Sequence, residues 1–478
     1  MVALQKIGRL TPKPAAKVTS SRLGIGFEKL DRAVFDPEKA YDKLAAIGVK
    51  WVRIQSGWQR TERTKGVYDF AWLDGIVDQL LSRGLLPWVN LCYGNALYNE
   101  QAKTSFGAVG CPPIIDGEER AAWLRYVTAL AVHLRGRVRH FEIWNEPDGN
   151  WSWKPNGANA TELGEFTKET AKAIRAAVPE AYLIGGVLYA HNATFLNEAL
   201  QTGMGEHLNA VSFHAYTLSE SDIYERVRAI RGLLDQYGLQ LDIIQGESGA
   251  QSCPFGAGAL RYADWTPYSQ AKALLRHLVT DLSTEVKFTS YFSCMDMIEA
   301  LRGKVGDKAS YLDYGYFGVL GADFDEDGFS TGDYAPKPAY FALQNLAALF
   351  AGEVRRVAPP VTFLREATVK PWVVRDVDFS ECHTAGFRLE NGTLLYAYWK
   401  NSEATTNDFH GTVTLCAGLP ADVPVHFIDP MDGAVYALPE GACRDLGHHN
   451  YYFPRFVIRD YPLFLAFGEL GGLVEEEV

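Results

Sequence analysis

Short apolar segments alternate with longer amphipathic segments through the first two thirds of the chain. Eight of the short segments are rich in β-branched and aromatic residues and have the length of strands. They are Leu23–Phe27, Trp51–Gln55, Leu86–Leu91, Val138–Trp144, Tyr182–Val187, Ala210–His214, Leu241–Gln245 and Val286–Phe292. Strands that alternate with helices build a parallel sheet or barrel. Eight such repeats predict a (β/α)₈ TIM barrel, of the α/β class.

The helical segments carry recognisable start and stop signals. Asp36-Pro37 has the pattern of an N-cap followed by proline in the first turn, and Gly48 suits the end of that helix. In the next repeat, Asp69 suits the start of the helix and Gly84 suits its end. The eighth helix is expected at Pro338–Phe350, so the barrel should end near residue 352.

After the eighth helix the pattern changes to short alternating strands separated by Gly, Pro, Asn and Asp. Examples are Thr384–Leu389, Thr393–Trp399, Gly411–Leu415 and Phe456–Arg459. This pattern predicts a small all-β sandwich. The expected organisation is therefore an N-terminal segment at 1–20, a catalytic barrel at 21–352 and a sandwich at 353–478. A strand at Val2–Leu10 would have no barrel partner, so we expect it to add to the sandwich.

Charge and composition exclude several classes of partner. The chain of 478 residues has 46 Lys and Arg against 58 Asp and Glu, a net charge of −12. Such a charge opposes binding to nucleic acid and to anionic membranes. Aromatic residues make up 13% of the chain, and their flat faces suit sugar rings as well as cores. A neutral ligand such as a glycoside is compatible with this composition.

The seven cysteines are scattered and odd in number, which is typical of reduced thiols in a cytosolic protein. Residues Met1–Ser21 lack a charged start followed by an apolar core, and no stretch of 18 uninterrupted apolar residues occurs. These features predict a cytoplasmic protein without membrane spans. Whether it forms a homo-oligomer stays open.

Two glutamates stand at predicted strand ends. Asn145-Glu146-Pro147 follows the fourth predicted strand, and Pro147 stops that strand from continuing. Glu247 comes directly after the seventh, in Gln245-Gly246-Glu247. Active sites of TIM barrels lie at the carboxyl ends of the strands, so both carboxylates should meet there. Glycoside hydrolysis commonly uses one carboxylic acid and one carboxylate in this way.

These segments resemble the clan of (β/α)₈ retaining glycoside hydrolases, and most closely glycoside hydrolase family 39, the β-xylosidase and α-L-iduronidase family. Trp144-Asn145-Glu146-Pro147 resembles the family's acid/base motif, and Glu247 stands at the place of its nucleophile. Arg53 is similar to the strand-two arginine that supports the nucleophile. His214 and Tyr216 are similar to the strand-six His-x-Tyr. The segment Lys337–Tyr340 resembles the return into the last helix, so the likeness covers nearly the whole chain.

The resemblance implies a mechanism with retention of configuration. Glu146 would be the general acid/base and Glu247 the nucleophile, with Arg53 holding Glu247 charged. Asn145 would bind the 2-hydroxyl of the sugar. Tyr216 would donate to Glu247, and His214 would bind a sugar hydroxyl. The expected substrate is an oligosaccharide or glycoside from which an exo-acting enzyme removes β-linked xylosyl or glucosyl residues.

Alternatives remain at this stage. The same mechanism would serve an arabinosidase, a galactosidase or an endo-glycanase, and a decayed barrel would serve as a non-catalytic carbohydrate-binding protein. Trp151, Trp153 and Trp58 are candidates for a wall that stacks on sugars, with core packing as the alternative. Asn90 and Tyr291 are candidates only because they lie near the ends of strands three and eight.

No cofactor or metal is predicted. The acidic segment Asp323–Gly328 matches the first half of a calcium loop, but Tyr334 stands where such a loop needs its bidentate glutamate. A solvated acidic turn is the simpler interpretation, and cation binding there stays open. The glycine pairs lack the spacing of a phosphate-binding loop.

Overall fold

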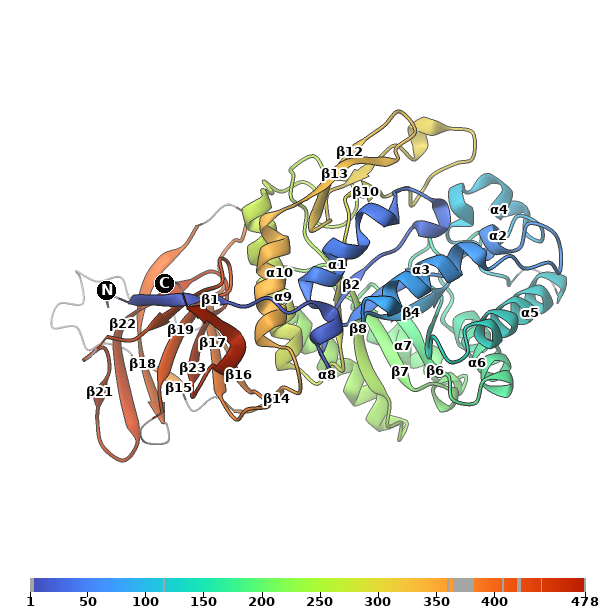
Figure 1. Ribbon diagram of the computed structural model, residues 1–478. Coiled ribbons are helices and arrows are strands. Elements are labelled where there is room, and N and C mark those ends of the chain that lie inside the picture. The colour runs from blue at the N-terminus through green and yellow to red at the C-terminus, as the bar shows by residue number, and fades with distance from the viewer. Residues whose placement is uncertain are drawn as a thin grey trace.

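A computed structural model describes residues 4–114, 117–358, 361–364, 382–405, 408–418, 423–439 and 441–476. Within these ranges eight parallel strands close a barrel, which confirms the predicted TIM fold (Figure 1). The strands are β2 (Leu23–Gly26), β3 (Trp51–Gln55), β4 (Leu86–Leu91), β5 (His140–Ile143), β6 (Tyr182–Leu188), β7 (Ala210–His214), β8 (Asp242–Ser248) and β9 (Thr289–Tyr291). They follow chain order around the barrel, and β9 closes onto β2.

Helices cover the outside of the barrel. They are α1 (Tyr41–Ile47), α2 (Trp58–Thr61), α3 (Ala71–Ser82), α4 (Glu100–Thr104), α5 (Gly117–His133), α6 (Ala160–Ala177), α7 (Ala193–Leu200), α8 (Glu220–Gln236), α9 (Pro267–Ser283) and α10 (Pro338–Leu349). Gly48 ends α1 with a φ of 89°, a conformation that glycine adopts without strain. Asp36 caps the 3₁₀ turn Pro37–Lys39, which leads into α1, rather than α1 itself.

Three strands match the predicted bounds and the others differ at their ends. The main difference is β8, which continues through Glu247 to Ser248 instead of stopping at Gln245. A bulge between Gln245 and Ser248 permits this continuation. Gly246 lies at the bulge, where a Cβ atom would come within 2.6 Å of Ser212 Oγ. Glu247 therefore projects from within a strand and not from a loop.

Two antiparallel sheets follow the barrel and form the predicted β-sandwich. Within the described ranges the larger sheet has the order β14-β16-β17-β23-β19-β20-β1-β24, and the smaller has β15-β18-β22-β21. Their bounds are β1 (Gln5–Leu10), β14 (Arg355–Arg356), β15 (Val361–Leu364), β16 (Cys382–Arg388), β17 (Leu394–Lys400), β18 (His410–Gly418), β19 (Val425–Asp429), β20 (Ala434–Ala437), β21 (Arg444–Asp445), β22 (Asn450–Arg459), β23 (Leu463–Phe467) and β24 (Val474–Glu476).

The N-terminal strand β1 pairs with β20 and β24, so both ends of the chain lie on the sandwich (Figure 1). Residues 1–3 of the predicted N-terminal segment and 365–381 of the predicted sandwich region lie outside the described ranges. We keep 21–352 and 353–478 as a proposed division into domains.

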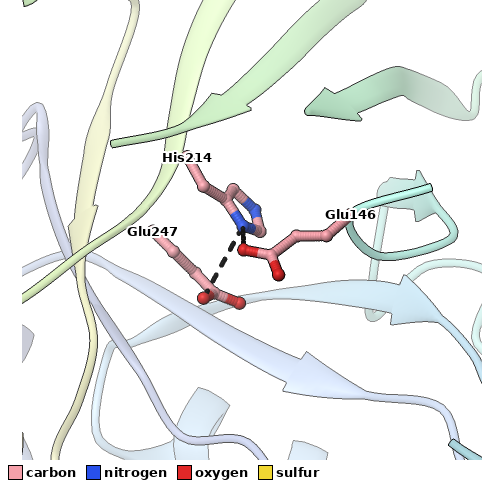
Figure 2. A group of neighbouring side chains, drawn as sticks. All are labelled: Glu146, His214 and Glu247. Atoms are coloured by element: carbon pink, nitrogen blue, oxygen red, sulfur yellow. Dashed lines mark hydrogen bonds and ion pairs between the residues drawn. The ribbon is translucent and has the colours of Figure 1, made fainter. Parts of the chain in front are cut away.

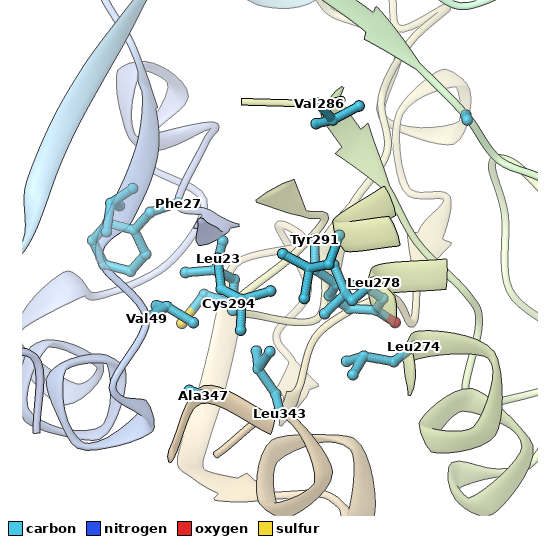
Figure 3. Packing of buried hydrophobic residues seen from close by; sticks show 14 of the residues in the cluster. Leu23, Phe27, Val49, Leu274, Leu278, Val286, Tyr291, Cys294, Leu343 and Ala347 are labelled. Atoms are coloured by element: carbon cyan, nitrogen blue, oxygen red, sulfur yellow. The ribbon is translucent and has the colours of Figure 1, made fainter. Parts of the chain in front are cut away.

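Helices α9 and α10 lie between the barrel and the sandwich (Figure 1). Leu274 and Leu278 of α9 and Leu343 of α10 are fully buried in the core that also contains the barrel strands (Figure 3). On the sandwich side, Lys272 Nζ of α9 lies 2.7 Å from Asp460 Oδ2, and both side chains are buried. This buried ion pair gives the contact between the two parts a defined geometry.

Two short hairpins extend the loop after β9. Strand β10 (Met297–Ile298) pairs with β11 (Tyr314–Gly315), and β12 (Leu320–Phe324) pairs with β13 (Ser330–Pro336). All seven cysteines lie in the described ranges and are free thiols. Among the described residues, no helix combines the length and the apolar composition that crossing a bilayer requires.

Candidate active site

The two predicted glutamates meet at the mouth of the barrel. Glu146 follows β5, Glu247 belongs to β8, and each side chain is buried with 8% of the residue exposed. His214, at the end of β7, lies between them (Figure 2). Its Nδ1 atom is 2.8 Å from Glu146 Oε1 and 3.6 Å from Glu247 Oε2. One oxygen of each carboxylate and one ring nitrogen lie within 4.8 Å of one another.

The backbone around Glu146 is held in an unusual conformation. Trp144 has a φ of 68° and Glu146 a φ of 48°, both in the left-handed region that residues with a side chain rarely adopt. The amide of Glu146 donates to the carbonyl of Val187 at 3.0 Å, so β6 helps to hold this turn. Local strain of this kind, at about 1–3 kcal/mol per residue, is concentrated at functional sites.

Arg53 of β3 supports the second glutamate. Its Nη1 donates to Glu247 Oε1, and its Nη2 donates to Asn145 Oδ1 at 2.8 Å. The same guanidinium lies 3.3 Å from Glu28 and 2.6 Å from Glu142. A single buried cation therefore faces several carboxylates, which cannot all ionise easily.

The environments of the two central carboxylates push their pKa values apart. Burial raises the pKa of Glu146, and the charge of Glu247 adds to this despite the opposing effect of His214. Burial also disfavours the charge on Glu247. However, the charges of His214 and Arg53 and the hydrogen bond from Tyr216 Oη, at 2.8 Å, hold its pKa below the usual value. At neutral pH the pair thus favours one protonated and one ionised carboxyl.

The two glutamates and Tyr216 border a cavity of about 530 Å³, which we call the reactive cavity, whereas Arg53 and His214 are not among its lining residues. Its lining includes Asn145, Glu146, Tyr216 and Glu247, together with Trp151. A concave site with a few convergent polar groups and perturbed pKa values is the usual form of an enzyme active site.

The family described as Glycosyl hydrolases family 39 matches residues 38–358, more than half of the chain. The chain belongs to glycoside hydrolase family 39. As a member of this family the protein is a glycosidase, and its substrate is a carbohydrate.

Solved structures share the fold of this family 39 enzyme. A family 39 glycoside hydrolase from Bacteroides cellulosilyticus WH2 aligns with a TM-score of 0.64 at 17% identity, over 93% of this chain and 80% of that one. A monomeric β-xylosidase from Caulobacter crescentus CB15 aligns with a TM-score of 0.61 at 17% identity, over 97% and 98%. A family 39 enzyme from Xanthomonas axonopodis pv. citri gives 0.60 at 18%, over 98% of each chain. At these identities the likeness concerns the fold alone.

Several predicted site residues lie elsewhere in the family 39 enzyme. Trp58 and Trp153 are each 0% exposed and are not among the residues that line the reactive cavity, although Trp58 lines a neighbouring cavity, so stacking on a sugar stays a prediction for both. Trp58 is enclosed by aromatic rings, including Trp123 at 5.4 Å, and Trp153 lies against Phe166 at 5.7 Å. Only Trp151 of the three tryptophans borders the reactive cavity within the described residues.

Asn90 and Tyr291 are also buried away from the reactive cavity. The Asn90 amide donates to Glu142 Oε2 at 3.0 Å and to the carbonyl of Trp144, so it supports the end of β5. Tyr291 Oη donates to the carbonyl of Ala250 at 3.2 Å, which ties β9 to the loop after β8. A position near a strand end does not by itself bring a side chain to the cavity, because Asn90 and Tyr291 are buried and point to the residues that they support.

Sequence reasoning missed seven charged residues that line the reactive cavity: Glu28, Lys29, Arg32, Arg261, Glu299, Arg302 and Asp313. Lys29 Nζ lies 3.1 Å from Glu299 Oε1, and both side chains are buried. Burial together with the charge of Glu247 raises the pKa of Glu28 to about 8, although Arg53 opposes the shift. Glu28 directly follows the first predicted strand, so the strand-end rule that found Glu146 could have found it. Glu299 lies in the long loop after β9, where no sequence pattern marks it.

Two groups of acidic residues bear on the question of a metal. Glu146, His214 and Glu247 have donor atoms close enough to ligate a cation. However, Arg53 and Tyr216 already contact the two oxygens of Glu247, and the Arg53 charge repels a cation. In the acidic turn after β12, Asp325 accepts from the amides of Asp327 and Phe329, which explains that carboxylate as a turn former.

Proposed function

We propose that this family 39 glycosidase is a retaining, exo-acting enzyme that removes β-linked xylosyl or glucosyl residues from oligosaccharides. The observation that carries the proposal is the buried carboxylate pair. One carboxylate oxygen of Glu146 lies within 4.8 Å of one carboxylate oxygen of Glu247. Retaining enzymes place the two carboxyl groups about 5–5.5 Å apart, whereas inverting enzymes need about 6.5–9.5 Å to admit a water. The short separation supports double displacement.

In the first step of this mechanism, an oxygen of Glu247 attacks the anomeric carbon while the bond to the glycosidic oxygen breaks. Glu146 gives its proton to the departing oxygen, a role that its raised pKa suits. In the second step Glu146 takes a proton from a water molecule, whose oxygen attacks the anomeric carbon and releases Glu247. The configuration at the anomeric carbon is thus retained.

The neighbouring residues have distinct proposed parts. Arg53 and Tyr216 keep Glu247 ionised and aimed, since each donates to a different oxygen. Arg53 also holds the Asn145 side-chain oxygen, so the Asn145 amide group is oriented to donate to the sugar's 2-hydroxyl. His214 keeps Glu146 in place through the contact at 2.8 Å. Trp151 offers a ring face at the cavity wall.

Cavity size and a solved relative bear on the choice of substrate. A cavity of about 530 Å³ lies within the range of small-molecule sites, which favours a terminal sugar over a long glycan in a cleft. The solved β-xylosidase from Caulobacter crescentus has the same fold. The intact pair argues against the non-catalytic alternative. A cytoplasmic location belongs to the same proposal, supported by the seven free thiols.

The test is hydrolysis of a panel of aryl β- and α-glycosides, with the first anomer formed followed by NMR. We expect turnover of a β-xyloside or β-glucoside with retention, lost in Glu146→Gln and Glu247→Ala. An inverted product would overturn the double displacement. Turnover of arabinosides or galactosides would change the sugar but leave the mechanism, and activity confined to polymeric glycans would replace exo with endo action.

A further inference from the structure

A second cavity of about 470 Å³ adjoins the reactive cavity. It is lined by the segments after β2, β3 and β4, and it shares Arg32 and Tyr93 with the reactive cavity. We call it the arginine cavity. The two cavities thus have wall residues in common and are neighbours at the mouth of the barrel.

The two cavities differ in charge. Among the described residues that line the arginine cavity, the charged side chains are Arg32, Arg60, Arg63 and Asp31. Three cations therefore face one carboxylate. In the reactive cavity, by contrast, five carboxylates outnumber four cations among the lining residues that the structure describes. A cationic cavity is unexpected in a protein with a net charge of −12.

Contacts with neighbouring residues hold Arg60 and Arg32 in place. Arg60 donates through Nη1 to the carbonyl of Leu30, and its guanidinium lies 4.3 Å from the Trp72 ring centre. Arg32 donates through Nη2 to Gln55, and its Nε lies 3.3 Å from Asp31 Oδ1. A guanidinium has five N–H donors, and these contacts occupy only some of the donors of each arginine. Guanidinium groups that are fixed in place and keep free N–H donors are suited to bind the oxygens of an anion.

The three arginines of the arginine cavity share a single carboxylate, Asp31, among the charged residues that line it. Burial lowers the pKa of Arg60, and the charge of Arg63 adds to that effect, against the opposing charge of Asp31. Arg63 is exposed at the cavity rim. Crowded cations of this kind gain free energy when an anion binds between them.

We propose that the arginine cavity binds an anionic group of the glycan, a carboxylate such as that of a uronic acid or a sulfate or phosphate ester, next to the sugar in the reactive cavity. This inference rests on the proposed function for the orientation of the substrate. It adds a substrate class, because a neutral xylo-oligosaccharide brings no negative charge to balance the three arginines, which face only Asp31 in this lining.

The test measures binding, so that it does not depend on turnover. Isothermal titration calorimetry on Glu247→Gln compares a neutral xylo-oligosaccharide with the same oligosaccharide carrying a glucuronic acid substituent, a sulfate ester or a phosphate ester. We expect at least one anionic ligand to bind about 10-fold or more tightly than the neutral one, because hydrogen bonds to charged groups contribute about 1.5–3 kcal/mol. Added salt should reduce this preference.

The variants Arg60→Gln and Arg63→Gln, combined in the Glu247→Gln background, should remove most of the preference. Arg135→Gln is the matched control, since Arg135 is an exposed arginine that pairs with Glu180 and lines neither cavity. Equal binding of neutral and anionic ligands, or an equal preference in the double variant and the control, would overturn the inference. The anionic ligand that binds best identifies which oxyanion the cavity takes.

Failure of the proposed function would look different. If no aryl glycoside is hydrolysed by the wild-type enzyme while the anionic ligand still binds through Arg60 and Arg63, the exo-acting assignment fails and the arginine cavity stands. If aryl glycosides are hydrolysed but no anionic ligand is preferred, the function stands and the inference fails.

Discussion

The floor and the mouth of the barrel are built from the same strands but have opposite chemistry. The floor is the apolar cluster of Trp51, Trp88, Tyr182, Ile184, Ala210, Ile244 and Phe288. The mouth is the group Glu28, Arg53, Glu142, Asn145, Glu146, His214, Tyr216 and Glu247. Phe288 stacks on Trp51 with ring centres 4.6 Å apart, whereas Arg53 faces carboxylates. The floor stabilises the fold, and the mouth holds charges that burial disfavours.

One barrel thus keeps the residues that stabilise it at the floor and the proposed catalytic residues at the mouth. Buried ion pairs seldom stabilise a protein more than well-packed apolar groups of similar size. The crowded carboxylates at the mouth are therefore best explained by chemistry, and the cost is offset by packing at the floor and by helices α9 and α10. Substituting the catalytic pair at the mouth and substituting apolar residues at the floor should therefore give opposite profiles of activity and stability.

Glu247→Ala should have the largest effect on activity. We expect kcat/KM to fall by about 10⁴-fold or more, because Glu247 is the proposed covalent nucleophile. Stability should change little, because Glu28 and Glu142 still face the Arg53 charge in the variant. Aryl glycoside kinetics and thermal unfolding measure both. Glu180→Ala, at an exposed ion pair, is the control; activity retained in Glu247→Ala would remove this residue from the mechanism.

Arg53→Met should damage both properties. The variant leaves Glu28, Glu142 and Glu247 buried without their cation, which costs about 3–5 kcal/mol of unfolding free energy. Activity should fall as well, since the pKa of Glu247 rises. Chemical denaturation measures the first effect. Arg53→Lys keeps the positive charge but loses the bidentate guanidinium, so its stability and activity should lie between those of the wild type and of Arg53→Met. A fully stable and active Arg53→Met would show that this residue does not organise the mouth.

Phe288→Ala tests the floor. Truncating this buried ring should cost about 3–5 kcal/mol of unfolding free energy through lost packing and a cavity. The kcat/KM of the folded enzyme should stay close to wild type, because the mouth is built from the other end of the strands. A large loss of activity with little loss of stability would break the proposed separation.

Glu28→Gln should give the smallest effect, visible only in its dependence on pH. The pKa of Glu28 is about 8 in the folded protein against an ordinary 4.5, so folding favours the protonated form. The stabilisation by this proton is fully present below about pH 4.5 and is lost as the pH rises through 8. Glutamine cannot ionise, so the Tm of the variant should fall less steeply between pH 5 and pH 9. Parallel Tm profiles for wild type and variant would contradict the raised pKa.

Much of the fold and part of the site could be predicted from local pattern. The strands β3, β4 and β7 were predicted at their observed bounds, since each is a buried apolar run between turn residues. Glu146 and Glu247 could be found because parallel strands in a barrel end at the same face. The extension of β8 could not be predicted, because its bulge depends on the neighbouring Ser212 and His214.

The barrel, the sandwich and the meeting of the two glutamates follow from the amino-acid sequence, because strand period and strand ends are local properties of the chain. Which aromatic rings are buried and which border a cavity depends instead on the folded structure. Trp58 and Trp153 are fully buried, whereas Trp151 borders the reactive cavity, although only one residue separates Trp151 from Trp153. The folded structure also brought Arg32, Arg60 and Arg63 to one wall. Such outcomes depend on the packing of loops distant in sequence, which no local pattern encodes.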